Sequence, residues 1–132
     1  MKKTIIPLII FTLIIVFSSC KKTKLFDYRN KYIGEYDFEI HRGSFNMNDT
    51  TSSNSTVYYD GEILNGEGDS TLNIIYRKNS TTELYVSKDG ELYRDSYYPT
   101  KGEFTDDGDV EFSFYSGGMG GGTTTSVKGT KK

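Results

Sequence analysis

The chain has little of what metal sites and disulfides are made from, because its 132 residues contain one cysteine and one histidine. A single cysteine cannot form an internal disulfide, and with a single histidine it cannot complete a four-ligand zinc site. Tryptophan is missing, there are only 2 prolines, and the formal net charge is −2. A slightly acidic chain has no basic footprint, so nucleic acid is not an expected partner. The length leaves room for one domain.

Long apolar runs are confined to the N-terminus. Basic residues precede an apolar stretch over residues 5–17, and the small residues Ser18 and Ser19 follow it. A basic start, an apolar middle and small residues at the end are typical of a secretory signal. The stretch is shorter than the roughly 20 residues that a membrane-spanning helix needs. We therefore predict a signal peptide over residues 1–19, with an uncleaved membrane anchor as the alternative.

From residue 31 onward the apolar residues follow a period of two rather than 3.6, which is typical of strands. In the first segment an apolar row alternates with a polar row, Glu35, Asp37, Glu39 and His41. Similar apolar rows recur around residues 57–63, 72–76, 84–92, 102–114 and 123–130. We therefore predict an all-β domain over residues 31–132, an antiparallel meander of about eight strands that forms a small barrel or a sandwich.

Turn signals divide this domain. Asp89-Gly90 predicts a tight two-residue hairpin turn, and the acidic residues 106–109 predict a second hairpin. Residues 43–56 are mostly Ser, Thr, Asn and Asp, and residues 116–122 are rich in glycine. We expect the first stretch to be a long polar loop, and the second to be a loop or a bulged strand edge.

Signals for chemistry are weak. The glycine run is followed by threonines rather than by a helix, so it does not predict a phosphate-binding loop. Asp106, Asp107 and Asp109 lack the closing glutamate of a calcium loop and fit a hairpin turn better. The sequence has no Gly-x-Ser-x-Gly nucleophile elbow to pair with His41. The carboxylates in the same row as His41 are typical of a solvated strand face. We predict no metal, no cofactor and no catalysis.

Tyrosine is in surplus, with 11 in the chain. Six of them fall on the opposite parity from the apolar rows and are expected to face outward, namely Tyr58, Tyr85, Tyr93, Tyr97, Tyr98 and Tyr115. Exposed aromatic rings stack on sugars or anchor protein contacts, which makes these residues candidate ligand-binding positions. The alternative is a fold in which both faces of the sheet are partly covered.

The residues around the single cysteine add a family resemblance. Phe17-Ser18-Ser19-Cys20 resembles the lipobox of bacterial lipoproteins, in which a peptidase cuts before the cysteine and acyl chains such as palmitate are attached to it. The Ser-Cys-Lys-Lys start looks like lipoproteins of the Bacteroidota. The resemblance implies lipidation at Cys20, a tether over residues 20–30, and an outer-membrane address. The absence of acidic residues after the cysteine favours the periplasmic face over surface exposure.

Three further segments extend the resemblance. Residues 32–36, 117–120 and 127–132 look like parts of small Bacteroidota lipoproteins, and Gly34-Glu35-Tyr36 is loosely similar to the start of lipocalin-like barrels. That similarity implies a small apolar ligand. Asp49-Thr50-Thr51 and Asp69-Ser70-Thr71 resemble the Asp-Ser/Thr-X glycosylation sites of this phylum, which implies glycans on Thr50 and Ser70; unmodified hydroxyls are the alternative.

Taken together, these features predict a lipid-anchored envelope protein with a non-catalytic β-barrel binding or interaction domain. Its expected partners are the membrane, through the anchor, and a small apolar ligand, a glycan or an envelope protein. A purely structural envelope component is the first alternative, and a small hydrolase is the second. A lined cavity or clustered exposed tyrosines would indicate a binding module, whereas a filled barrel with a flat polar surface would indicate a structural part.

Overall fold

The computed structural model describes residues 27–94 and 99–132. A short 3₁₀ helix, η1 (Tyr28–Lys31), precedes antiparallel strands that close into a barrel in the order β1-β2-β3-β4-β5-β6-β7-β8. The strands are β1 (Gly34–Asn46), β2 (Thr51–Asn65), β3 (Thr71–Arg77), β4 (Ser80–Val86), β5 (Glu91–Arg94), β6 (Thr100–Phe104), β7 (Val110–Gly118) and β8 (Gly121–Lys131). The predicted eight-stranded meander is confirmed, and of the two predicted architectures it is the barrel. Within the described residues, no helix has the length and hydropathy of a membrane span.

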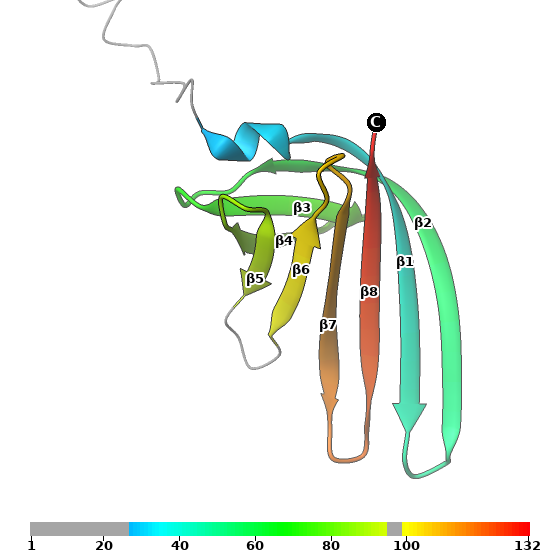
Figure 1. Cartoon of the computed structure of the whole chain (residues 1–132). Helices are drawn as coiled ribbons and strands as arrows, with labels where there is room; N and C mark the ends of the chain where they lie inside the picture. Colours follow the sequence, from blue (N-terminus) through cyan, green and yellow to red (C-terminus); the bar gives the residue numbers. More distant parts are fainter. Residues whose placement is uncertain (1–26, 95–98) are drawn as a thin grey trace, which may run out of the picture.

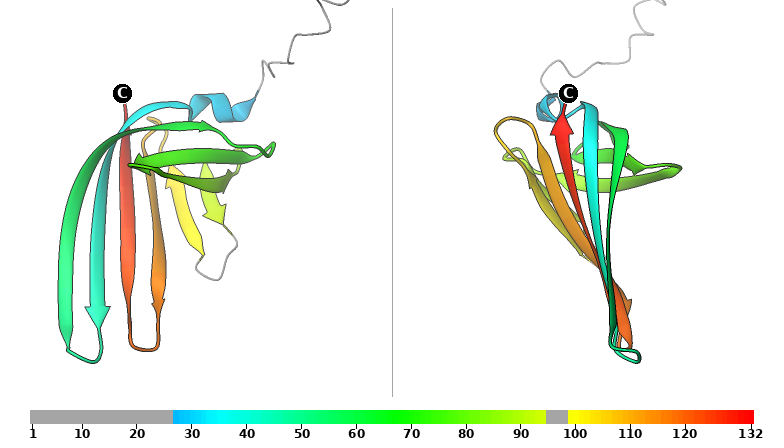
Figure 2. Two further views of the ribbon diagram at one scale, coloured as in Figure 1. Left: turned by 180° about the vertical axis from the view of Figure 1, so that it is seen from behind. Right: turned by 90° about the vertical axis from the view of Figure 1, so that its right-hand side faces the viewer.

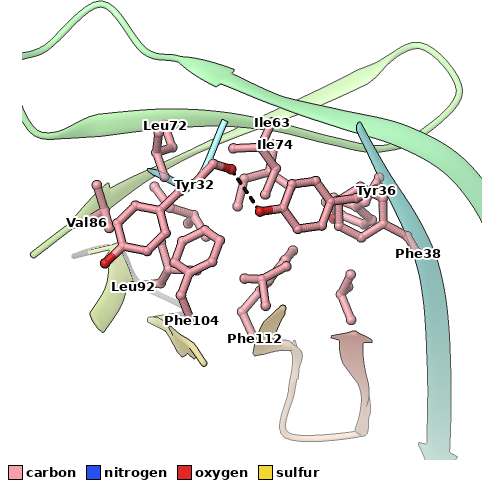
Figure 3. Close-up of a cluster of buried hydrophobic side chains, with 14 of the residues drawn as sticks. Tyr32, Tyr36, Phe38, Ile63, Leu72, Ile74, Val86, Leu92, Phe104 and Phe112 are labelled. Atoms are coloured by element: carbon pink, nitrogen blue, oxygen red, sulfur yellow. Dashed lines mark hydrogen bonds between the residues drawn. The ribbon is translucent and has the colours of Figure 1, made fainter. Parts of the chain in front are cut away.

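The barrel interior is filled by rings and aliphatic side chains (Figure 3). Tyr76 lies edge-on between Phe38 and Phe112, with ring centroids 6.4 Å and 5.5 Å away. Phe38 also needs glycine on both neighbouring strands, because a Cβ on Gly61 would lie 2.9 Å from its ring and one on Gly129 only 2.6 Å. The inward rows of the predicted strands therefore meet in one packed core.

Four of the strands continue beyond the barrel as a single-layer sheet (Figures 1 and 2). We call this extension, residues 43–54 and 115–124, the blade; its strand order is β2-β1-β8-β7. Register is unbroken from Gly43↔Asn54 and Gly43↔Thr124 to the two tips. The tips are joined by a hydrogen bond of 3.0 Å that the Met47 N–H donates to the Gly120 carbonyl.

The blade overturns the prediction of a loop over residues 43–56. Of the two alternatives for residues 116–122, the structure shows strand edges joined by a short turn, without a bulge. Both faces of this sheet are open to water and mostly polar, so the sequence shows no regular apolar alternation there, although threonine itself favours strands. The glycines are held in strands by an aromatic cover, since a Cβ on Gly122 would collide with the ring of Tyr115. The real connections are short, residues 47–50 and 119–120.

Both predicted hairpins are present, with longer turns than expected. The β4–β5 turn spans residues 87–90 rather than two residues, and Gly90 has a φ of 94° that favours glycine. The Glu91 N–H donates to the Ser87 hydroxyl at 3.0 Å, which closes this wider turn. In the β6–β7 turn, Thr105 N–H donates to the Asp109 carbonyl at 2.8 Å.

The η1 helix covers one end of the barrel (Figure 1). The buried Arg29 guanidinium donates to the carbonyls of Gly68 at 2.6 Å and Thr71 at 2.9 Å, and it pairs with the Asp27 carboxylate at 2.6 Å. Tyr28 adds a bond from its hydroxyl to the Val86 carbonyl at 2.9 Å. Residues 27–30, within the stretch predicted as tether, therefore pack as part of the folded domain.

Candidate binding surface

The polar row of β1 lies on the outer face of the barrel, as its alternation predicted. Register places Tyr58 of β2 and Lys128 of β8 on either side of Glu39, and Asp60 of β2 beside Asp37. These side chains line a shallow outer groove of about 560 Å³. The groove offers carboxylates, an ammonium group and the exposed ring of Tyr58 to a ligand.

Lys132 neutralises part of this acidic groove. Its Nζ lies 2.9 Å from an Asp37 oxygen and 3.2 Å from an Asp60 oxygen. The hydrogen bond from Lys132 lowers the pKa of Asp37, and the same contact raises the pKa of Lys132. These groups are exposed to water, so the pairs add little to stability and serve mainly to order the surface.

His41 sits between a hydroxyl and a carboxylate. Its Nδ1 lies 2.9 Å from the Thr56 hydroxyl and its Nε2 lies 3.1 Å from a Glu39 oxygen. The Tyr58 hydroxyl donates to the same Glu39 oxygen at 3.2 Å, and the charge of Glu39 raises the pKa of Tyr58. Hydroxyl, imidazole and carboxylate in this order are also found in acyl-transfer enzymes.

The surroundings of His41 do not favour that chemistry. The His41 side chain is 53 % exposed and that of Glu39 is 37 % exposed. Nucleophile activation and oxyanion stabilisation depend on a preorganised site from which water is excluded. On an open strand face the same groups are better suited to hydrogen-bonding a polar ligand.

The predicted outward tyrosines are exposed, but they do not form one cluster. Tyr85 and Tyr93 pair across β4 and β5 and stack with ring centroids 5.3 Å apart. Tyr58 is 74 % exposed beside the acidic groove, and Tyr115 lies on the blade. Tyr97 and Tyr98 lie outside the described residues.

The blade carries functional candidates that sequence reasoning missed. On one face the half-exposed Phe45 of β1 lies between Ser52 of β2 and Gly122 of β8. On the other face one row carries hydroxyl side chains from all four strands: Ser53, Ser44, Thr123 and Ser116. The only signal for these rows in the sequence is an abundance of hydroxyl residues without alternation, so the rows become visible only once the strand pairing is known.

The modification sites lie in different settings. Thr50 is exposed at the tip of the β1–β2 turn with a φ of 49°, an unusual conformation for a β-branched residue. Ser70 is half-buried in the β2–β3 turn, and Cys20 lies outside the described residues.

Among the residues with described positions, no group of three or more His, Cys, Asp or Glu side chains could hold a metal ion. In the acidic turn at residues 106–109, the Asp109 carboxylate accepts the Lys131 N–H at 3.0 Å, which ties the turn to the end of β8. Comparison of the chain with protein-family models, with curated proteins and with solved structures finds no match.

Proposed function

We propose that this chain is a lipid-anchored, non-catalytic interaction protein of the bacterial envelope, in which the barrel is a rigid support and the blade is the contact surface. One observation carries the proposal. The barrel interior is packed with side chains, whereas four strands continue past it as a sheet exposed on both faces. Exposed backbone and side chains on a rigid sheet suit contact with another molecule better than enclosure of a small one.

The filled interior bears on the type of ligand. Lipocalin-like binding of an apolar molecule needs an interior left open by small side chains. Here Tyr36, Phe38, Tyr76 and Phe112 occupy the interior and are fully buried. An envelope protein or a glycan bound on the outside is therefore our preferred partner over a small apolar ligand.

The geometry suits an anchor at the end of the barrel opposite the blade tip. β1 starts just after η1 and reaches the blade tip after 13 residues, which is about 43 Å of strand. After removal of the signal peptide, acylated Cys20 and a short tether before Asp27 would hold the η1 end nearest the membrane. The blade would then project away from the bilayer.

The anchor is tested by acyl labelling. Cells fed an alkyne analogue of palmitate should label the wild-type chain, and Cys20→Ser should abolish the label and, because the peptidase cuts before the cysteine, leave the signal segment attached. The matched control is Ser19→Ala, which keeps a small residue at the cleavage point and should label normally. Labelled Cys20→Ser protein would contradict the anchor.

The contact surface is tested by photo-cross-linking in intact cells. A photo-reactive residue replaces Thr124 on the blade or Glu83 on the outside of β4, both exposed positions. We expect discrete adducts from position 124 and none from position 83. Adducts from the barrel position alone, or from neither, would contradict a role for the blade.

A second candidate function, hydrolysis, rests on the contacts of His41 with Thr56 and Glu39. The exposed setting leads us to expect that His41→Gln changes the rate of p-nitrophenyl acetate hydrolysis by less than about twofold, in contrast to the losses of 10²-fold or more at true general bases. A large loss would support the hydrolase instead.

A further inference from the structure

An open edge runs along β2. This strand pairs with β1 from Thr51 to Ile63, but it pairs with β3 only from Glu62 to Asn65. Nothing in the described part of the chain pairs with the other side of β2 before Glu62. β2 is accordingly the outermost strand on one side of the blade in Figure 1. An unpaired strand edge is a template for another strand.

The groups that this edge presents follow from the register. The Glu35 carbonyl accepts from Lys132, the residue that follows β8, so odd-numbered residues of β1 direct their backbone groups to β8 and even-numbered ones to β2. Since Tyr36 pairs with Gly61, the odd-numbered residues of β2 bond to β1. The N–H and C=O groups that point away from β1 therefore belong to Ser52, Asn54, Thr56 and Tyr58.

The edge lacks the features by which proteins block such pairing. Edge strands are commonly protected by lysine, proline, a bulge or short length. Residues 51–59 contain no charged residue and no proline, and their pairing with β1 runs without a register shift. The edge is therefore long, regular and uncharged.

We propose that this edge pairs with the same edge of a second copy, antiparallel about a two-fold axis at Ser55. In that register the even-numbered residues meet as hydrogen-bonded pairs, Ser52 with Tyr58 and Asn54 with Thr56 of the second copy. Each large Tyr58 ring then lies opposite a small serine. Ser55 faces its own counterpart as a non-hydrogen-bonded pair, where side chains are closest.

Charge favours a second copy in this orientation. The chain is acidic overall, so two copies are best brought together at an uncharged contact. Parallel pairing in register would place Asp60 beside Asp60, whereas the antiparallel pairing sends Asp60 and Glu62 to opposite ends, beyond the overlap. A basic partner would instead be drawn to the acidic groove.

The dimer goes beyond the proposed function and does not depend on it. It uses only the backbone edge of β2 and leaves both blade faces open to other molecules. Because the pairing is isologous, each copy uses its β2 edge once, so this contact stops at two copies.

The test uses the full-length chain in the cells that make it, wherever it is located, with Ser55→Cys and mild oxidation. Counterparts at Ser55 would lie within disulfide reach, so we expect a reducible dimer on a gel. The matched control is Ser53→Cys on the same face, whose counterpart would be about 13 Å away along the strand and should cross-link at least about fivefold less. Wild type measures any background from Cys20.

Ser52→Pro gives an independent check in the Ser55→Cys chain. It removes an edge N–H that does not bond to β1, so the fold should survive while the dimer decreases about fivefold. An unchanged melting temperature of the purified chain confirms the fold. The pairing would be overturned if Ser55→Cys stayed monomeric or if Ser53→Cys cross-linked equally well. It would also be overturned if Ser52→Pro had no effect or if the adduct contained a different protein. Cross-linking at Thr124 tests the blade's role separately.

Discussion

At the residue scale, Tyr36 combines a ring buried in the core with a hydroxyl that is hydrogen-bonded to two backbone carbonyls. Its ring is fully buried, and its hydroxyl lies 2.8 Å from the Tyr32 carbonyl (Figure 3) and 3.0 Å from that of Gly108. The bond joins the start of β1 to the β6–β7 turn across the barrel end. Burial, followed by the charge of Asp109, raises the pKa of Tyr36 well above its usual value.

We expect Tyr36→Phe to cost about 1–2 kcal/mol of unfolding free energy at pH 7, because the carbonyls lose their donor. The pKa is raised in the folded state, so the tyrosine contributes stability below the unfolded pKa of about 10 and loses it as pH rises above that value. The wild type should therefore weaken above about pH 10 more steeply than Tyr36→Phe. Urea unfolding across this range measures both effects, with exposed Tyr93→Phe as the control.

Glycine at position 61 is a second residue-scale requirement. A Cβ there would collide with the Ile75 carbonyl and press on Phe38, so Gly61→Ala should destabilise the barrel by about 1–3 kcal/mol. Gly118→Ala is the matched control, because nothing lies within 4 Å of its added Cβ. Equal thermal stability of the two variants would contradict the packing described for Phe38.

At the scale of elements, the alternation of apolar and polar residues predicted the strands that pack around the core. It did not predict the blade strands, which have no buried face. The rows around Tyr36, Ile74 and Phe112 follow a period of two because one face of each strand is buried. The blade strands have water on both faces, so polar residues such as Ser44 and Thr123 leave no pattern to read. The outward parity of Tyr58, Tyr85, Tyr93 and Tyr115 could be predicted from the same rule, but their separation could not, because it depends on barrel closure.

The η1 helix was missed because its main contact is made by a charged residue. Arg29 looks like part of a solvated tether, yet its side chain is 8 % exposed and that of Asp27 is 9 % exposed. Their pairing, together with two backbone carbonyls, meets the condition under which a charge tolerates burial. No periodicity in the sequence predicts the bonds from Arg29 to the Gly68 and Thr71 carbonyls, which lie 39 and 42 residues away.

We expect Arg29→Met to cost roughly 3 kcal/mol, because it removes the counter-charge of the buried Asp27 carboxylate and the guanidinium bonds to the Gly68 and Thr71 carbonyls. The double variant Arg29→Met with Asp27→Asn should recover part of this loss, since the uncompensated charge is gone. Guanidinium unfolding followed by circular dichroism measures both. Full stability in Arg29→Met would show that these contacts of Arg29 do not fix η1 to the barrel.

At the scale of the whole molecule, we expect the stability of the fold to come from the barrel and not from the blade. The core lies within the barrel, and the blade adds rows of exposed polar side chains beyond it. The blade can be deleted by replacing residues 43–54 with Asn-Gly and residues 115–124 with a second Asn-Gly. Each two-residue turn then directly joins a hydrogen-bonded pair of the barrel, Arg42–Ser55 in the first case and Phe114–Thr125 in the second. This variant should melt cooperatively within about 5 °C of the wild type. Loss of cooperative melting would show that the blade is part of the stabilising core.

The position of the buried Arg29 cluster also has a mechanical consequence. If the chain is tethered through the residues before Asp27, any tension from the membrane enters the domain at η1. The load then falls on the bonds to Gly68 and Thr71, at the start of β3, before it can reach the hydrogen bonds between strands. A force on the anchor would thus be resisted first by the contacts of Arg29 at the end of the barrel, and the hydrogen bonds of the sheet would break last.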